Sequence, residues 1–487
     1  MRRAAVVAVA AVVAMLAVPA ARGAGSVTAV TVDAARPQGP INRDLVGAGW
    51  VPGAGPAIAP LQPRFVRIDA SLQDVSPDRD SFRIQPLLDQ VAAIRGIGGE
   101  PLVILSYMPA WLGGPNAYGR DATKVAPADP DAWQALVHRT VLALATAPAR
   151  ATWFEAWNEP DIPIFWQDSP TAWVDTMTRS ARAVRDVQRE TGVRLHFGGA
   201  ATAVPDPVYL AAFLAPFRDD ASLPLDFVSW HYYGNYPFLG PDGPEPLVPA
   251  PLTAAWPAVG RRNPIADPAT FGGQVPLVRQ WTAAYLAGSG RAMPLLVLDE
   301  WNVSAGGFDT RNDTHEGAAF DAAVLEELQA AGLDASAFFH AADSYGGHPG
   351  DFGLVTSSGQ PKPAWWTFWL WQRLEPQRVV VTPSRGDGVW ATASLGRRSL
   401  TLLLASFSAS RPADHDVDVT LANMPWRVGR VTVRRLDPAH ASASIAEPTA
   451  IDGNGHVRIH LPAQSVAFVQ VDARRPPSLR PARMNDG

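Results

Sequence analysis

The sequence predicts an α/β fold class, a (β/α)8 TIM barrel with an appended all-β sandwich domain. Short, nearly continuous apolar runs recur eight times, as expected for a parallel sheet covered on both faces, and helical patterns separate most of them. Beyond residue 375 the helical patterns stop. The chain of 487 residues is long enough for a barrel of about 250 residues or more and a second domain. The eight runs span residues 46–50, 65–69, 102–108, 152–157, 195–200, 227–231, 295–300 and 336–341.

Capping residues predict the limits of two intervening helices. Ser169 precedes a stretch whose apolar residues fall on one helical face, and Gly192 follows it. A second stretch, residues 314–331, has the same one-sided pattern and is followed by Gly332. Both stretches predict helices that cover the barrel.

Short strands with alternating apolar residues replace helices near the C-terminus, which predicts the sandwich. An early alternating segment, residues 27–33, precedes the barrel and is expected to join it. The predicted domains are a signal peptide (1–24), a catalytic barrel (34–375), a β-sandwich (27–33 plus 376–472) and a disordered tail (473–487). The predicted sandwich strands are 378–382, 388–395, 399–405, 416–421, 429–436, 456–461 and 466–471.

The N-terminus has the pattern of a secretory signal. Two arginines precede an apolar run over residues 4–18, and small residues follow it. A membrane anchor is the alternative, but the run is shorter than the roughly 20 residues that span a bilayer. We therefore expect a secreted or periplasmic protein with no membrane association in its mature form.

Composition excludes several classes of function. A net charge of −5 offers no basic excess to attract nucleic acid. Cysteine is absent, so disulfides, thiolate nucleophiles and Cys-ligated metal sites are impossible. No phosphate loop, dinucleotide fingerprint or nucleophile elbow occurs in the sequence.

Two glutamates end opposite strands of the predicted barrel. Glu159 lies in the segment Trp-Asn-Glu-Pro (157–160) after the fourth run, and Glu300 lies in Asp-Glu-Trp-Asn (299–302) at the end of the seventh. Barrel enzymes carry their chemistry at the C-terminal strand ends. A single glutamate there is ordinarily a solvated loop residue, but two at matching positions are the minimum apparatus for glycoside hydrolysis.

These segments resemble the clan A retaining glycoside hydrolases, and most closely glycoside hydrolase family 39, which contains β-xylosidases and α-L-iduronidases. Segments 106–109, 229–233, 353–355 and 360–364 also resemble family motifs. The resemblance covers residues 27–374. It implies that Glu300 is the nucleophile and Glu159 the acid/base, and that Asn158 bonds the sugar 2-hydroxyl.

The resemblance also implies supporting roles for three residues. Tyr233 would orient Glu300, and His231 would line the same wall. Arg67 would keep Glu300 ionised, because a nearby cation lowers the pKa of a carboxyl group. Glu159 needs a raised pKa, part of which the negative charge of Glu300 would supply.

The eighth strand departs from the clan pattern, because segment 338–343 lacks the usual Trp platform beneath the cleaved sugar. Phe339, or Trp301 from the neighbouring strand, would have to stack on the sugar instead. Asp343 ends the same segment and is a further candidate for substrate binding. Trp111 falls in a strand-end loop, where aromatic faces stack on sugar rings.

No metal or cofactor is expected. His231, His340 and His348 are candidates to converge near the barrel mouth, but no zinc-binding HExxH pattern or Asp-rich calcium loop is present.

The predicted partner is an oligosaccharide or polysaccharide. The default function is exo-acting β-xylosidase-like hydrolysis. An endo-acting hydrolase of a bacterial exopolysaccharide is an alternative, since the long loop over residues 234–273 is compatible with a pocket or an open cleft. A second alternative is a non-catalytic carbohydrate-binding barrel.

Overall fold

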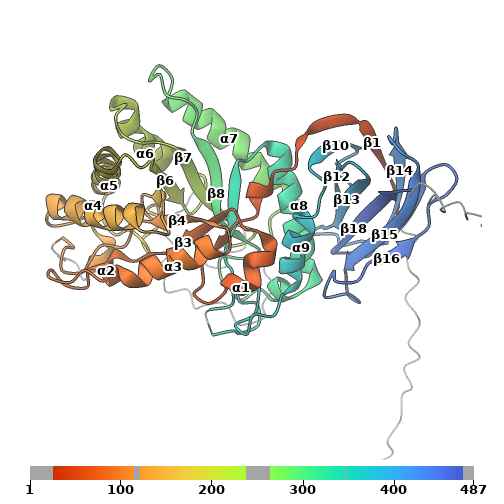
Figure 1. The fold of residues 1–487 in the computed structure, drawn as a ribbon, viewed down its shortest axis with the longest axis horizontal. Helices are drawn as coiled ribbons and strands as arrows, with labels where there is room; N and C mark the ends of the chain where they lie inside the picture. Colours follow the sequence, from red (N-terminus) through yellow and green to blue (C-terminus); the bar gives the residue numbers. More distant parts are fainter. Residues whose placement is uncertain (1–25, 115–120, 237–263, 345, 475–487) are drawn as a thin grey trace, which may run out of the picture.

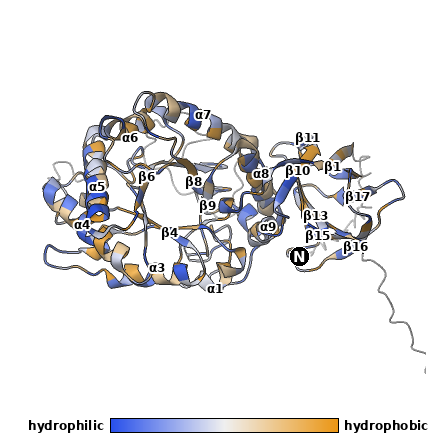
Figure 2. Ribbon diagram, turned by 45° about the horizontal axis from the view of Figure 1, so that its top comes forward, coloured by the Kyte–Doolittle hydropathy of each residue, from blue (hydrophilic) through white to orange (hydrophobic). Residues whose placement is uncertain are grey.

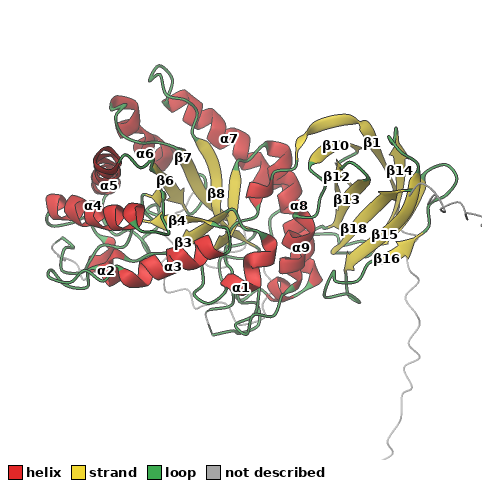
Figure 3. Ribbon diagram, in the orientation of Figure 1, coloured by secondary structure: helices red, strands yellow, loops and turns green. Residues whose placement is uncertain are grey.

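The computed structural model describes residues 26–114, 121–236, 264–344 and 346–474. It contains a barrel ringed by helices and, beside it, a domain built of strands (Figure 1). Figure 3 shows that the helices belong to the barrel, whereas loops connect the strands of the second domain. The predicted fold class is confirmed.

Eight parallel strands close the barrel in sequence order, β2 to β9. Each overlaps one of the eight apolar runs. Their bounds are β2 (Ala48–Gly49), β3 (Phe65–Ile68), β4 (Glu100–Ile104), β5 (Trp153–Glu155), β6 (His196–Thr202), β7 (Phe227–Tyr233), β8 (Leu295–Asn302) and β9 (Ala335–Phe338).

Helices surround the strands, as the view along the barrel shows (Figure 2). The two helices predicted from capping residues are confirmed. Ser169 Oγ accepts a hydrogen bond from Ala172 N at 3.2 Å, and Gly192 ends that helix with φ 69°. The bounds are α1 (Gly55–Ile58), α2 (Leu72–Val75), α3 (Gln85–Gly96), α4 (Pro130–Thr146), α5 (Pro170–Thr191), α6 (Pro207–Asp219), α7 (Ala269–Tyr285), α8 (His315–Ala331) and α9 (Pro363–Trp371).

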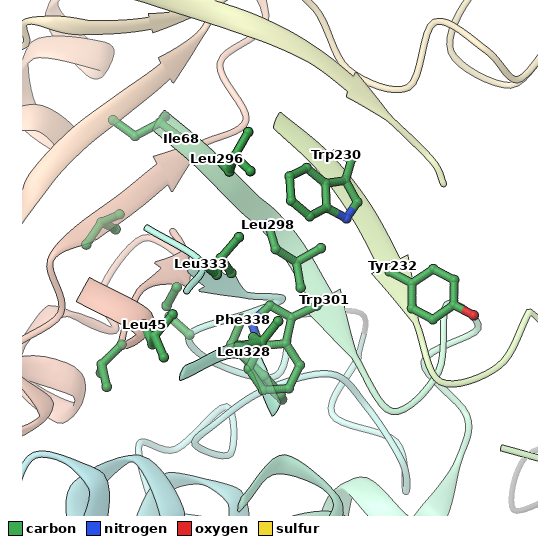
Figure 4. Packing of buried hydrophobic residues seen from close by; sticks show 14 of the residues in the cluster. Leu45, Ile68, Trp230, Tyr232, Leu296, Leu298, Trp301, Leu328, Leu333 and Phe338 are labelled. Carbon is green, nitrogen blue, oxygen red and sulfur yellow. The ribbon is translucent and has the colours of Figure 1, made fainter. Parts of the chain in front are cut away.

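Strand alternation divides the side chains of β7 and β8 between two environments. Trp230 and Tyr232 of β7 and Leu298 and Trp301 of β8 lie in the apolar cluster between strands and helices (Figure 4). The residues between them face the barrel axis. The pairing of β8 with β7 shifts register between the Trp230 and His231 pairs. This bulge places two successive acidic residues of β8 on the inner side.

The second domain is one continuous set of hydrogen-bonded strands folded around its own apolar core. β1 lies between β10, to which it is antiparallel, and β14, to which it is parallel. The strand order is β16-β15-β18-β13-β12-β10-β1-β14-β17, with β11 paired to β12. The bounds are β1 (Ser26–Pro40), β10 (Gln377–Thr382), β11 (Arg385–Gly386), β12 (Val389–Leu395), β13 (Ser399–Ser406), β14 (His415–Ala422), β15 (Val428–Leu436), β16 (Glu447–Thr449), β17 (His456–Leu461) and β18 (Ser465–Ala473).

β1 is longer than the segment 27–33 read from the alternation. It continues to Pro40, and its pairing with β10 shifts register after Asp33 and again after Pro37. These irregularities break the alternation of apolar residues, so the pattern in the sequence ends before the strand does. The barrel portion therefore begins after residue 40.

Helix α8 forms most of the contact between barrel and sandwich. Glu327 Oε1 accepts hydrogen bonds from Arg385 Nη1 and Trp390 Nε1, both at 2.8 Å. Phe320 packs edge-on against Phe407 with ring centroids 5.4 Å apart. Figure 1 shows α8 and α9 facing the strands of the second domain.

Several predicted segments lie outside the described residues. They are the signal peptide (1–24), positions 475–487 of the tail predicted over 473–487, and positions 237–263 of the long loop predicted over 234–273. The predicted tail begins one residue too early, since β18 continues to Ala473. The last part of that loop is helical, since α7 begins at Ala269. Among the described residues, no helix combines the length and apolar character needed to cross a bilayer.

Candidate active site

Glu159 and Glu300 meet at the barrel mouth. Glu300 lies near the end of β8, and Glu159 lies four residues beyond the end of β5, in a turn where its backbone has φ 41°. The Glu159 N–H donates to Ala201 O at 2.8 Å, which ties this turn to the end of β6. A carboxylate oxygen of each glutamate and a ring nitrogen of His231 lie within 4.8 Å of one another.

Arg67 of β3 connects Glu300 with the β5 side of the site. Its Nη1 donates to Glu300 Oε2 at 2.8 Å, and its Nη2 donates to Asn158 Oδ1 at 2.9 Å. Its Nε donates to Glu155 Oε2 at 2.7 Å. The side chain is 4% exposed, so these bonds form in a desolvated setting, where charged hydrogen bonds are strong.

Two tyrosines complete the inner contacts. The Tyr233 hydroxyl donates to Glu300 Oε1. On the opposite side, Asn158 Nδ2 donates to the Tyr107 hydroxyl at 3.1 Å. Arg67 bonds to the amide oxygen of Asn158 and Tyr107 bonds to its amide nitrogen, so the two contacts fix the orientation of the amide.

The two glutamates differ in their electrostatic surroundings. Burial is the largest effect on each and raises the pKa of both carboxyls. At Glu159 the charges of Glu300 and Asp161 raise the pKa further, well above its ordinary value. At Glu300 the Arg67 charge and the Tyr233 hydrogen bond lower the pKa and oppose burial. The pKa of both carboxyls is raised, but the surroundings favour the protonated form more strongly at Glu159 than at Glu300.

His231 lies between the acids. Its Nδ1 is 2.8 Å from Glu159 Oε1 and 3.7 Å from Glu300 Oε2, and its Nε2 is 3.6 Å from Asp299 Oδ1. Burial, with a smaller contribution from the Arg67 charge, lowers the pKa of His231 well below its ordinary value. A neutral imidazole with Nδ1 next to Glu159 can hold that carboxyl without adding a charge.

Glu159, His231 and Glu300 form the one group of potential metal ligands found among the described residues. The Arg67 guanidinium bonded to Glu300 disfavours a second cation there by repulsion. His340 and His348, which the sequence offered as candidates to join His231, do not belong to this group. His340 Nε2 lies 3.1 Å from Ser344 Oγ, and His348 stacks on Phe308 with centroids 4.4 Å apart.

Trp301 is not a sugar platform, contrary to the expectation from the sequence. It is fully buried and packs edge-on against Phe338 at 5.1 Å between centroids (Figure 4). Because Glu300 points inward, its neighbour points out toward the helices. Phe339 is partly exposed after the end of β9 and contacts Phe352, which in turn contacts Tyr233. Of the two predicted platforms, only Phe339 is accessible.

Asp343 is occupied by structural contacts. It is buried, forms an ion pair with Lys362 Nζ at 2.6 Å, and accepts a hydrogen bond from Gly353 N at 2.9 Å. Substrate binding by Asp343 stays a prediction. Trp111 is partly exposed, its Nε1 donates to Ser76 O at 2.9 Å, and the Arg79 guanidinium lies 5.1 Å from its ring centroid. It lines the loop region after β3.

Other acids of the site were not singled out from the sequence. Glu155 also accepts a hydrogen bond from Ser229 Oγ at 2.7 Å, and Asp299 lies 3.7 Å from Arg67. Asp161 accepts from Ala203 N, and burial raises the pKa of Asp161 to about 7. The signal was the same one that identified Glu159, namely acidic residues at the C-terminal ends of apolar runs.

The sequence is similar to those of known proteins. The sequence model of the glycosyl hydrolases family 39 matches residues 71–238. A β-xylosidase from Geobacillus stearothermophilus is 23% identical over 87% of this chain and 86% of its own length. A β-xylosidase from Caldicellulosiruptor saccharolyticus is 23% identical over 74% of this chain and 70% of its own.

Solved structures share the fold. A monomeric β-xylosidase from Caulobacter crescentus has a TM-score of 0.71 at 18% identity, covering 92% of this chain and 99% of its own. A family 39 enzyme from Xanthomonas axonopodis pv. citri has a TM-score of 0.68 at 19% identity, covering 94% and 99%. Barrel, paired glutamates and relatives together define this protein as a glycoside hydrolase. Within that class it is a family 39-like enzyme.

Proposed function

We propose that the protein is a retaining, exo-acting β-xylosidase-like hydrolase. The observation that carries this proposal is the close approach of Glu159 and Glu300, whose carboxylate oxygens come within 4.8 Å. Retaining enzymes hold their two carboxyl groups about 5–5.5 Å apart, whereas inverting enzymes need about 6.5–9.5 Å to admit a water molecule. The relatives named as β-xylosidases support the choice of sugar.

In the first step, the ionised Glu300 attacks the anomeric carbon while Glu159 donates its proton to the departing glycosidic oxygen. The glycosidic bond breaks and an ester to Glu300 forms. In the second step, Glu159 takes a proton from water, the water oxygen attacks the anomeric carbon, and the ester bond breaks. The proton returned to Glu159 restores the starting state.

The neighbours of each glutamate fit these roles. Arg67 and Tyr233 stabilise the charge on Glu300 before attack and after release. The fixed Asn158 amide is available to bond the sugar 2-hydroxyl, an interaction that strengthens in the oxocarbenium-like transition state. A binding protein would require neither a proton carrier nor a nucleophile.

Variants of the two glutamates test the proposal with aryl β-xylosides. Glu300→Ala is expected to abolish turnover with the fold intact by circular dichroism. Glu159→Ala is expected to lose about 10²- to 10⁴-fold in the first step on substrates with poor leaving groups, and much less on nitrophenyl substrates, which leave without protonation. Glu190→Ala, an exposed glutamate on α5, is the matched control and should retain activity.

The outcomes separate mechanism from substrate. Equal losses across leaving groups would contradict the acid role of Glu159, and inversion at the anomeric carbon, followed by NMR, would contradict a retaining mechanism. Release of internal fragments from a polysaccharide would favour endo action.

We also propose that the protein is exported, supported by the arginine pair and apolar run at the N-terminus. A mature N-terminus near residue 25, determined on secreted protein, would support it.

A further inference from the structure

An acidic residue directly after β3 lies at the same site as Arg67. Asp69 comes directly after β3 and two residues after Arg67, so both side chains project to the same side of the strand. Ile68 between them lies in the apolar cluster on the opposite side (Figure 4). Asp69 therefore faces the barrel mouth, where Arg67 holds Glu300 and Asn158.

Asp69 differs from the other acids of the site in its accessibility. Glu155, Glu159 and Asp299 are buried, whereas Asp69 is exposed. Its carboxylate accepts no hydrogen bond from the described residues, while Glu155 accepts bonds from Arg67 and Ser229. An exposed acceptor without a donor, in a site built to hold a sugar, is available to the hydroxyl groups of the ligand.

The charge of Asp69 reaches the reacting groups. It raises the pKa of Glu159, Glu300 and the Tyr107 hydroxyl. Burial raises the pKa of Asp69 itself, and the Arg67 charge opposes this. Arg67 is already shared among Glu155, Asp299 and Glu300.

We infer that Asp69 is a substrate-contacting, specificity-determining residue. Its carboxylate accepts hydrogen bonds from hydroxyls of the sugar that is cleaved, and its negative charge selects neutral glycosides over glycosiduronic acids. A uronate would bring another carboxylate to a site whose arginine is already engaged with three acids. This inference rests on the proposed function, because it assumes a sugar between Glu159 and Glu300.

The test compares Asp69→Asn and Asp69→Ala with wild type on nitrophenyl β-D-xyloside, β-D-glucoside and β-D-glucuronide. The glucoside and glucuronide differ in charge at C6 and share a six-carbon frame, so their ratio reports charge separately from size. Asp69→Ala should lower kcat/KM for the neutral substrates about 10- to 100-fold. Asp69→Asn keeps an acceptor without the charge, so it should lose less and raise the glucuronide-to-glucoside ratio at least about 10-fold. Asp80→Ala, an exposed acid in the loop after β3, is the matched control.

Each outcome decides one question. Unchanged kcat/KM and an unchanged glucuronide-to-glucoside ratio in an active Asp69→Ala enzyme would overturn the role of Asp69 and leave the proposed function standing. If wild type cleaves none of the three substrates, the proposed function fails for these sugars. In that case calorimetric binding of D-xylose, D-glucose and D-glucuronate decides the inference. Equal affinities in wild type and Asp69→Ala would overturn it, and weaker neutral-sugar binding in the variant would support it.

Discussion

At the scale of single residues, two carboxyl groups of the same kind have different neighbours, and the proposed mechanism assigns them different tasks. Glu300 has a guanidinium and a phenol as hydrogen-bond donors. Glu159 has an imidazole, made neutral by burial, and two acidic neighbours that raise its pKa. In the proposed mechanism, the side chains around the glutamates would set the division into proton carrier and nucleophile.

Tyr233→Phe tests this division. The hydroxyl bond favours ionised Glu300, so its removal should raise the pKa of Glu300 and move the acidic limb of the pH dependence of kcat/KM to higher pH. We expect kcat/KM at the optimum to fall about 10-fold, in keeping with the loss of one charged hydrogen bond.

The adjacent Tyr232→Phe is the control, because Tyr232 lies on the outer side of β7 and packs edge-on against Phe271 (Figure 4). Its pH profile should match wild type. An acidic limb that stays in place in Tyr233→Phe would show that the phenol does not stabilise the charge on Glu300.

Residue placement was predictable where strand alternation holds. It predicts His231 and Tyr233 on one side of β7, as found. Applied to β8, the alternation also places Trp301 outside the site, because its neighbour Glu300 points inward. The expectation that Trp301 stacks on the sugar did not take this alternation into account. The inward position of Asp299 next to Glu300 was not predictable, because it depends on the bulge, a three-dimensional feature with no periodic signal. The pairing of Asp343 with Lys362 joins residues 19 positions apart in a loop and likewise leaves no pattern.

At the scale of elements, α8 carries a buried acid that the reaction does not use. Asp321 is fully buried, and neither carboxylate oxygen has a hydrogen-bond partner among the described residues. Burial raises its pKa well above the ordinary value. The folded protein therefore keeps this carboxyl protonated at a pH where the unfolded chain ionises it.

Asp321→Asn should consequently stabilise the protein at neutral pH. Because the pKa of Asp321 is higher in the folded than in the unfolded protein, its contribution to folding stability is fully present below the unfolded pKa of about 3.9. That contribution is lost as the pH rises toward the folded pKa. The gain in Tm over wild type should thus be small near pH 4 and grow toward pH 7, by about 2–4 °C for each kcal/mol. Asp89→Asn, at an exposed position of α3, should show a difference that does not grow with pH. A gain that shrinks with rising pH would contradict the argument.

Elements with strong periodicity or clear caps were predicted with close limits. Helices α5 and α8 begin and end where Ser169, Gly192, Thr314 and Gly332 indicate. The eight barrel strands follow the apolar runs because both faces of a parallel sheet are covered. The second half of β1 was missed, since its register shifts remove the alternation on which the prediction depended.

At the scale of the whole molecule, one carboxylate of α8 makes two polar contacts between the barrel and the sandwich. Glu327→Ala would leave the Trp390 indole N–H without its acceptor and remove an ion pair with Arg385. We expect a loss of about 1–3 kcal/mol in the free energy of unfolding, measured in urea. Glu447→Ala, whose exposed pair with Arg435 is 3.9 Å long, should change it by less than about 1 kcal/mol. Equal effects of the two substitutions would mean that the contact on α8 adds nothing to stability.

The placement of β1 has a consequence for the order in which the chain matures. Ribosomes release the first strand long before β10 and β14, the two neighbours that it pairs with. The last barrel helix ends at Trp371, so all segments of the catalytic half have been synthesised while this strand still lacks both partners. The strand therefore stays without its antiparallel neighbour until residue 382 has been synthesised and without its parallel neighbour until residue 422 has, so the sandwich is completed only after the barrel sequence.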